Sequence, residues 1–356
     1  MSNNKRDGNI ELLRFIFANW IVLHHALLPR FRGGWLGVEF FFLLTGYYMA
    51  KNLEKDCEAH SNEPYRDTAA AGIRYIWNKF RKLFPYIFWS TILGFIVQAL
   101  DLSYGGSAKE IVKQAAKLPY DLLPLQNFGY ASLSCTGTLW YLSAMFFAIW
   151  LLYPIVRRRY HFYTGYLAPG IAIFLSGYLV RTYGMLGSAN DFSGVNINSG
   201  FVRAIAEISL GMFLYVISRI FEQKAMSRRE SILFTIIEIL SLVLLFLYMY
   251  FWKPETGYLD SIAVMLMFIG ITILMSGHSL LSGLFDNNLS RILGKISMVL
   301  FMNHAYWLFH IVSLCGKAGI EKPETDLKLI GILLSYCTTG LVFALVKIFR
   351  KKDGIM

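Results

Sequence analysis

Ten apolar stretches, each of about 20 residues, follow one another along most of this chain. A helix of about 20 residues is long enough to cross the roughly 30 Å hydrocarbon core of a bilayer. Because that core offers no water to the backbone, such stretches must form helices that satisfy their own hydrogen bonds. We therefore predict an all-α, polytopic membrane protein with about ten transmembrane helices in one integral-membrane domain over residues 1–356. The predicted spans are 10–28, 34–52, 84–101, 137–156, 164–184, 200–221, 231–251, 258–276, 292–314 and 327–348.

The composition supports this class and excludes a soluble globular protein. Hydrophobic residues make up 56% of the chain and charged residues only 16%, which is outside the range of soluble domains. The first stretch lacks the small-residue cleavage site of a signal peptide, so we interpret it as a retained helix. Cys57, Cys135, Cys315 and Cys337 have no metal-type spacing, and we expect unpaired thiols.

The distribution of basic residues predicts the orientation in the membrane. With Lys5 and Arg6 in the cytoplasm, 22 of the 34 Lys and Arg residues fall on the cytoplasmic side and 11 on the other. Positive residues accumulate on the cytoplasmic side of membrane proteins, so both termini are predicted to be cytoplasmic, in agreement with an even number of spans. The formal charge of +11 then reflects topology. Since the basic residues are spread over several loops, we expect no nucleic-acid partner.

Two connections between the predicted spans are long. Residues 53–83 are predicted to form a basic cytoplasmic loop, and residues 102–136 an external segment with an amphipathic helix near 107–117. Neither connection has the length or composition of a separate soluble domain, and the chain shows no clear internal repeat.

Two ionisable residues, Arg14 and His25, lie in the first apolar stretch. Eleven residues correspond to three helical turns plus about 20°, so the two side chains share one helix face and lie roughly 16 Å apart along the axis. Glu11 is on the same stripe. Such a stripe is costly against lipid, and we expect it to face the interior of the bundle. The alternative is a purely structural role, with Arg14 extending to the cytoplasmic surface.

Glu39, in the second stretch, is the predicted partner of His25. His25 precedes Arg32 by seven residues and Glu39 follows it by seven, so a hairpin at this turn places the two side chains at similar depth. A carboxylate beside an imidazole fixes its tautomer and raises its basicity, as a general base requires. We therefore predict a catalytic group of His25, Glu39 and Arg14. A structural hydrogen bond between the two helices is the alternative.

The spacing of Arg14 and His25 resembles the Arg-x10-His motif of acyltransferase family 3, membrane-bound enzymes that O-acylate surface glycans. The stretch from Gly34 to Tyr47 is similar to that family's Gly-Val-acidic-x-Phe-Phe-x-Leu-Ser-Gly segment, with Thr45 where Ser is usual. Three later segments resemble family motifs in the same order, so the resemblance covers nearly the whole chain. They are Leu83-Phe84-Pro85, Trp140-Tyr141-Leu142-Ser143 running on to Tyr153-Pro154, and Ser297 to His304.

The chain departs from the family pattern at two places. Its basic motif reads Lys79-x-x-Lys82 with Arg81 inside it, where the family has two arginines, so charge is kept but bidentate phosphate contacts are not. Met145 stands where many members carry Glu.

The resemblance implies a cytoplasmic acyl-coenzyme A donor, most simply acetyl-CoA. Cationic side chains at the cytoplasmic face would bind its phosphates, and the predicted binding residues are Arg14, Lys79, Arg81 and Lys82. The cluster of Lys79, Arg81 and Lys82 could equally be a determinant of topology alone. His25 would take a proton from a glycan or glycolipid hydroxyl as that hydroxyl attacks the thioester, or would form an acyl-histidine intermediate. The residues do not separate these two mechanisms.

Other residues and functions rank lower. His304 could line the site, although a satisfied interhelical histidine is the favoured interpretation, and we expect no metal because no cluster has ligand spacing. A transporter or flippase of lipid-linked sugars is the alternative function. We predict a multi-pass O-acetyltransferase of the bacterial cytoplasmic membrane, acting on a cell-surface polysaccharide or a lipid-linked glycan.

Overall fold

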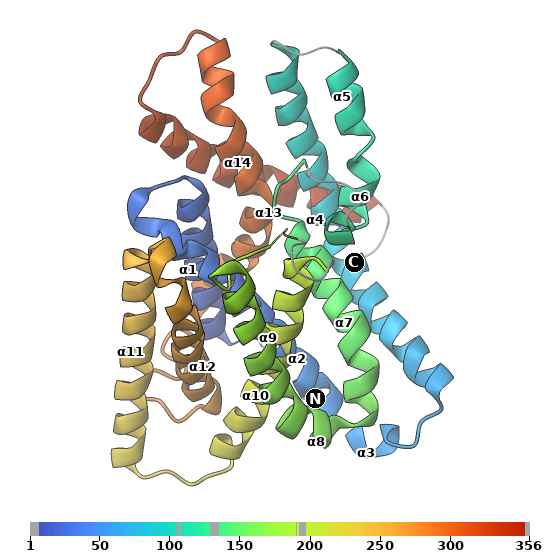
Figure 1. Ribbon diagram of the computed structural model, residues 1–356, viewed down its shortest axis with the longest axis vertical. Helices are drawn as coiled ribbons and strands as arrows, with labels where there is room; N and C mark the ends of the chain where they lie inside the picture. Colours follow the sequence, from blue (N-terminus) through green and yellow to red (C-terminus); the bar gives the residue numbers. More distant parts are fainter. Residues whose placement is uncertain (1–6, 105–107, 129–134, 190, 192–196, 353–356) are drawn as a thin grey trace.

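The computed structural model describes residues 7–104, 108–128, 135–189, 191 and 197–352 (Figure 1). It is 83% helical, and the residues it describes form no strand. The predicted all-α class is therefore confirmed. The helical elements are α1 (Gly8–His25), η1 (Pro29–Leu36), α2 (Gly37–Glu54), α3 (Cys57–His60), α4 (Tyr65–Ser103), α5 (Ala108–Ala115), α6 (Leu118–Leu122), η2 (Gln126–Phe128), α7 (Trp140–Arg158), α8 (Tyr160–Phe162), η3 (Tyr163–Leu167), α9 (Ala168–Tyr183), α10 (Ser199–Glu222), α11 (Arg228–Phe251), η4 (Pro254–Leu259), α12 (Asp260–Ser276), α13 (Asn288–Lys317) and α14 (Glu324–Lys352).

Eight helical segments among the described residues are long and apolar enough to cross a membrane. They match eight of the ten predicted spans. The other two predicted spans form α1 and α2, each 18 residues long, in which charged residues such as Arg14 and Glu39 lower the hydropathy. The count of ten and the cytoplasmic position of both termini stay predictions, and Lys5 and Arg6 lie outside the described residues. All four cysteines are free, as expected.

The prediction of a loop over residues 53–83 was wrong. Most of this segment is helical, because α3 lies within it and α4 begins at Tyr65 and continues through Pro85 to Ser103. The apolar residues Ile73, Ile76, Trp77 and Phe80 follow the helical i, i+3, i+4, i+7 pattern, which the basic composition of the segment obscured. A proline inside a membrane helix is tolerated where neighbouring groups satisfy the freed carbonyl.

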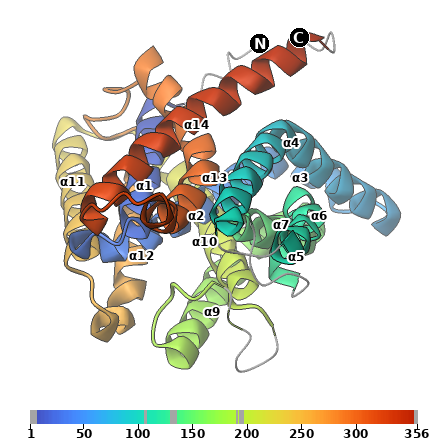
Figure 2. The same ribbon diagram turned by 90° about the horizontal axis from the view of Figure 1, so that it is seen from above.

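The bundle has an inner and an outer set of helices (Figure 2). In the most apolar 18-residue stretch of α10, 78% of the residues are buried, against 28% in the corresponding stretches of α4 and α11. The backbones of α2 and α10 approach closely where Gly46 faces the Ile208 carbonyl and Gly211 faces the Leu43 carbonyl, as small residues permit in membrane helices. On the other side of α1, Gly294 of α13 contacts the Glu11 side chain. Helices α1, α2, α10 and α13 therefore form the buried centre.

The two ends of the bundle differ in their elements. The lower end is the one at which α1, α4 and α13 begin, and the upper end is the one at which these helices finish (Figure 1). Glu63, before α4, accepts hydrogen bonds from Arg157 Nε at 2.7 Å and from Arg157 Nη2 at 2.8 Å, joining α4 to α7 at the lower end. This ion pair lowers the pKa of the Glu63 carboxyl to about 2. At the upper end, α5 confirms the amphipathic helix predicted near 107–117.

Asp121 holds the segment between α6 and α7 in place. It is fully buried, and its carboxylate accepts hydrogen bonds from Gln126 Nε2 at 2.8 Å and from the Cys135 backbone N–H at 2.7 Å. Burial raises the pKa of this carboxyl to about 6. An unfolded aspartate titrates near pH 4, so between about pH 4 and 6 the folded chain binds more protons than the unfolded chain.

Stability should consequently fall as pH rises through that window, by on the order of 3 kcal/mol from this group, and stay level above it. Asp121→Asn removes the titration, and a turned Gln126 amide can accept from the new side-chain NH₂. Thermal midpoints measured from pH 4 to 8 should therefore converge for wild type and variant at the acidic end and separate toward neutral pH. Thermal midpoints of wild type and variant that stay parallel from pH 4 to 8 would contradict the assignment of this pH dependence to Asp121.

Candidate active site

His25, the last residue of α1, lies against His304 of α13. The distance from His25 Nδ1 to His304 Nε2 is 3.2 Å, and the two ring centroids are 5.0 Å apart. His304 is fully buried, whereas His25 is partly exposed. The two residues are brought together because α1 and α13 run side by side in the same direction.

Two backbone carbonyls indicate which ring nitrogen of each histidine carries hydrogen. His304 Nδ1 lies 3.2 Å from the Leu300 carbonyl, and His25 Nδ1 lies 3.0 Å from the Ile21 carbonyl. A carbonyl oxygen can only accept, so both Nδ1 atoms carry hydrogen when the rings are neutral. The one hydrogen on His25 Nδ1 is then shared between the Ile21 carbonyl and His304 Nε2, which leaves the lone pair of His25 on Nε2.

This arrangement suits a general base. A proton taken up at His25 Nε2 leaves Nδ1–H in place, and the hydrogen bond to His304 Nε2 becomes stronger when its donor is charged. His304 therefore orients the ring of His25 as the third group orients the base in nucleophile–base–orienter sites. The nearby Phe309 ring, 5.7 Å from that of His25 between centroids, restricts the approach on one side.

Arg14 lies on the same helix as His25 and lines two cavities. The larger, of about 750 Å³, is at the lower end and is bordered by charged side chains, among them Lys51, Lys55 and Arg219. The smaller has a volume of about 120 Å³. Arg14 Nη1 is 3.5 Å from Glu11 Oε1, while its buried Nε has no hydrogen-bond partner among the described residues. Arg14 thus offers a buried N–H group at the junction of the two cavities.

The small cavity leads from Arg14 toward the histidine pair. Lys79 lines it together with Thr45, Tyr141 and Ser297. Phe301 also lines it, and the Phe301 ring lies 5.8 Å from the ring of His304 between centroids. One aromatic side chain therefore separates this cavity from His304.

The structure divides the predicted donor-binding residues into two groups. Arg14 and Lys79 line one cavity, although they come from different helices. Arg81 and Lys82 are exposed on α4 and line neither of these two cavities. At 100° per residue, Arg81 is about 200° around the helix from Lys79, which explains why Arg81 lies outside the cavity that Lys79 lines.

Comparison with known protein families bears directly on this site. An acyltransferase domain family matches residues 7–348. The chain belongs to acyltransferase family 3. The resemblance inferred from the motifs is thereby confirmed, and it covers essentially the whole chain. No curated protein and no solved structure shows a significant match.

In this acyltransferase, Glu39 is paired with Arg203 of α10, and the structure records no hydrogen bond between Glu39 and His25. Arg203 Nε donates to Glu39 Oε1 at 2.6 Å, and its two Nη atoms donate to the carbonyls of Gly187 and Trp35 at 3.2 and 3.1 Å. Glu207 is buried one turn further along α10. The predicted juxtaposition of Glu39 and His25 is replaced by two separate pairs, His25 with His304 and Glu39 with Arg203.

Sequence reasoning missed the role of Arg203 and Glu207. Arg203 is one of the 11 basic residues predicted to lie outside the cytoplasm, and the sequence alone assigns it no partner. Both residues lie inside the predicted span 200–221, and ionisable residues within an apolar span are a signal of a functional or structural role.

One group of three possible metal ligands occurs among the described residues. Cys57, Glu58 and His161 place ligand atoms within 4.8 Å of one another at the lower end, and Glu58 and His161 are exposed. This group belongs to α3 and α8, away from the elements that carry the histidine pair, and we assign it no part in the acyltransferase site.

Proposed function

We propose that this acyltransferase moves an acyl group, most simply acetyl, from cytoplasmic acyl-CoA to a hydroxyl of a cell-surface polysaccharide or lipid-linked glycan. The observation that carries the proposal is the His25–His304 pair, one aromatic ring beyond the end of a cavity bordered by Arg14 and Lys79. The base and the cationic residues thus lie along a single route. The proposal places the enzyme in the bacterial cytoplasmic membrane with both termini in the cytoplasm.

The two cavities support the assignment of the donor. The 750 Å³ cavity is large enough for a sizeable polar ligand. Acidic residues border it as well as basic ones, and Arg219 is paired with Glu222, so Arg14, Lys51 and Lys55 are the cations that would contact phosphate groups. The 120 Å³ cavity is narrow, which suits an extended arm ending in a small acyl group. Arg81 and Lys82, exposed within one turn of Lys79, add positive charge to the same part of α4.

The reaction requires two proton transfers, one from the acceptor hydroxyl to His25 and one from His25 to the leaving thiolate. His25 Nε2 takes the proton of the acceptor hydroxyl as the oxygen forms a bond to the thioester carbonyl carbon. The C–S bond then breaks, and the coenzyme A thiolate leaves and recovers the proton from His25. Arg14 holds the donor at the junction of the cavities. Glu39 and Arg203 act as positioning residues, because their pair fixes the turn that follows α1.

Donor binding tests the proposal. Lys79→Ala should weaken acetyl-CoA binding about tenfold, or about 1.4 kcal/mol, because a cation at the cavity wall is lost. Isothermal titration of the purified protein measures this effect, which should diminish at high salt. Arg74→Ala is the matched control, since Arg74 is exposed on the same helix and lines none of the described cavities. A folded wild-type protein without saturable acetyl-CoA binding would favour the flippase alternative.

A further inference from the structure

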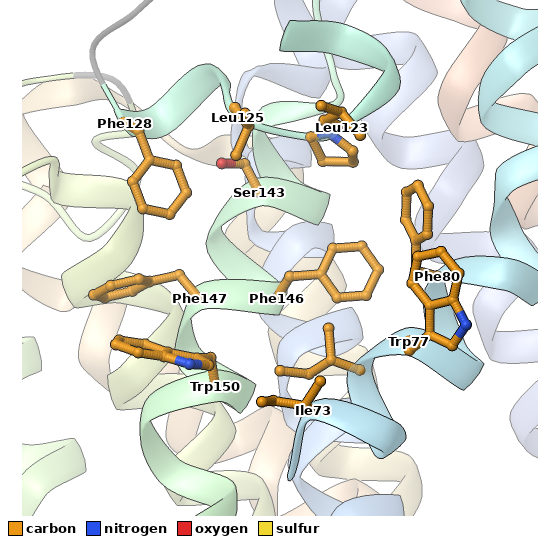
Figure 3. A pocket seen from close by; sticks show the side chains of 12 residues that line it. Ile73, Trp77, Phe80, Leu123, Leu125, Phe128, Ser143, Phe146, Phe147 and Trp150 are labelled. Carbon is orange, nitrogen blue, oxygen red and sulfur yellow. The ribbon is translucent and has the colours of Figure 1, made fainter. Parts of the chain in front are cut away.

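Two further features lie outside the acyltransferase site, and the first is an apolar groove between α4 and α7 (Figure 3). The groove has a volume of about 500 Å³, and Trp77, Phe147 and Trp150 are among the side chains that line it. Ser143, the one polar side chain in the lining, is completely buried. Lipid tails are as apolar as the rest of this lining, so the groove does not select one lipid chain over another, and we assign it no occupant.

The second feature is a cluster of three metal-ligating side chains at the lower end of the bundle, where α3 and α8 lie side by side (Figure 1). Cys57 and Glu58 are the first two residues of α3, and His161 is the middle residue of α8. One ligand atom from each residue lies within 4.8 Å of the other two. Cys57 and His161 are 104 positions apart in the chain, which is why the spacing of residues in the sequence predicted no metal site.

The distances within this cluster fit a shared cation better than hydrogen bonds. His161 Nε2 is 3.7 Å from Cys57 Sγ and 3.5 Å from Glu58 Oε1. The nitrogen–oxygen distance is longer than the roughly 2.7–3.2 Å of an ordinary N–H···O hydrogen bond. In addition, one ring nitrogen either donates to the carboxylate or accepts from the thiol, so a single hydrogen bond satisfies only one of the two contacts. A cation between the three ligand atoms satisfies both.

Tetrahedral coordination of Zn²⁺ reproduces these separations. With bonds of about 2.3 Å to sulfur and about 2.1 Å to nitrogen and oxygen, tetrahedral angles place sulfur about 3.6 Å from nitrogen, and nitrogen about 3.4 Å from oxygen. The two distances from His161 Nε2 differ from these values by only about 0.1 Å. Thiolate sulfur and imidazole nitrogen also favour Zn²⁺ over Mg²⁺ and Ca²⁺, which bind oxygen ligands.

An ion pair next to the cluster holds its two halves together. Glu63, which follows α3, accepts hydrogen bonds from Arg157 Nε at 2.7 Å and from Arg157 Nη2 at 2.8 Å. The backbone carbonyl of Glu63 also accepts from Arg158 Nη1 at 2.6 Å. These contacts fix the segment that contains α3 against the end of α7, directly before α8 begins. Ligands that are held in place before binding lose less conformational freedom when the ion arrives.

We propose that Cys57, Glu58 and His161 bind one Zn²⁺ ion, which joins the connection between α2 and α4 to the corner between α7 and α9. The side chains of Glu58 and His161 are 89% and 73% exposed, so the ion reaches them from solution and water takes the fourth coordination position. The Cys57 thiol releases its proton to solution on binding, and His161 binds through the lone pair of Nε2. None of the three residues lines either cavity of the acyltransferase site, so the ion takes no part in acyl transfer.

Zinc titration of the purified protein, without an affinity tag, tests this site. Isothermal titration should show one Zn²⁺ ion bound per chain, with no competition from excess Mg²⁺. Changes in the groups that surround metal ligands cost about 10–100-fold in affinity, so Cys57→Ser and His161→Ala, which each remove a ligand, should each weaken binding at least about 100-fold. Cys337→Ser is the matched control, because Cys337 is also a free cysteine but lies on α14, and it should bind Zn²⁺ as the wild type does.

Cobalt substitution shows whether the Cys57 thiolate is a ligand. Co²⁺ bound by a thiolate gives a sulfur-to-metal charge-transfer absorption in the near ultraviolet, which should be present in wild type and Cys337→Ser and absent in Cys57→Ser. Cys57→Ser is nearly isosteric and His161 is on the surface, so both variants should fold, and Zn²⁺ should raise the thermal midpoint of the wild type but of neither variant. A wild type without saturable Zn²⁺ binding, or equal affinities in wild type and both variants, would overturn the proposal.

Discussion

Replacing His25 by alanine should lower the rate of acyl transfer by a factor of at least 100 while leaving acetyl-CoA binding intact. General bases contribute about 10² to 10⁴ in rate, and His25 is the histidine whose Nε2 lone pair is left free by the pairing of its Nδ1 with Ile21 and His304. The measurement is release of coenzyme A thiol from acetyl-CoA in membranes that contain the native acceptor. Titration with acetyl-CoA checks that the donor site is preserved.

His161→Ala is the matched control for this experiment. His161 is 73% exposed in its side chain and lies at the lower end of the bundle, so thiol release should stay at the wild-type rate. Equal expression and equal thermal midpoints would show that His25→Ala is folded. A folded His25→Ala protein with full activity would remove His25 from the mechanism.

Local properties of the sequence predicted the fold class and the family. Hydropathy is a property of consecutive residues, so eight predicted spans correspond to helices that are long and apolar enough for a membrane. The α4 helix shows the limit of this reasoning, because its first part is amphipathic and basic and was interpreted as a loop. The ordered motifs, read together, gave the correct acyltransferase family.

Contacts between distant helices could not be predicted in the same way. His304 is 279 residues from His25, and Arg203 is 164 residues from Glu39. The sequence indicates that ionisable groups in apolar spans need partners, but several candidates exist at similar depth. Equal spacing from Arg32 favoured Glu39 as the partner of His25, whereas the close approach of α2 and α10 at Gly46 and Gly211 places Glu39 beside Arg203.

Arg203→Met should be the most destabilising of the substitutions considered in this protein. Arg203 is 1% exposed, and its removal leaves the fully buried Glu39 carboxylate without its ion-pair partner. The other oxygen of that carboxylate, Oε2, already lacks a hydrogen-bond partner among the described residues. Breaking a buried ion pair from one side costs about 3–5 kcal/mol. Thermal unfolding in detergent, followed by intrinsic fluorescence, should show a much lower midpoint.

The double variant Arg203→Met/Glu39→Gln distinguishes loss of charge balance from loss of packing. If the unpaired Glu39 carboxylate is the main cost, neutralising it should recover part of the lost stability, and the two substitutions should be strongly non-additive. Arg181→Met, at an exposed position of α9, should have little effect. Additive losses would show instead that Arg203 acts through its contacts with the Gly187 and Trp35 carbonyls. Since Trp35 belongs to the turn that follows His25, Arg203→Met should also lower activity, because that turn holds the end of α1.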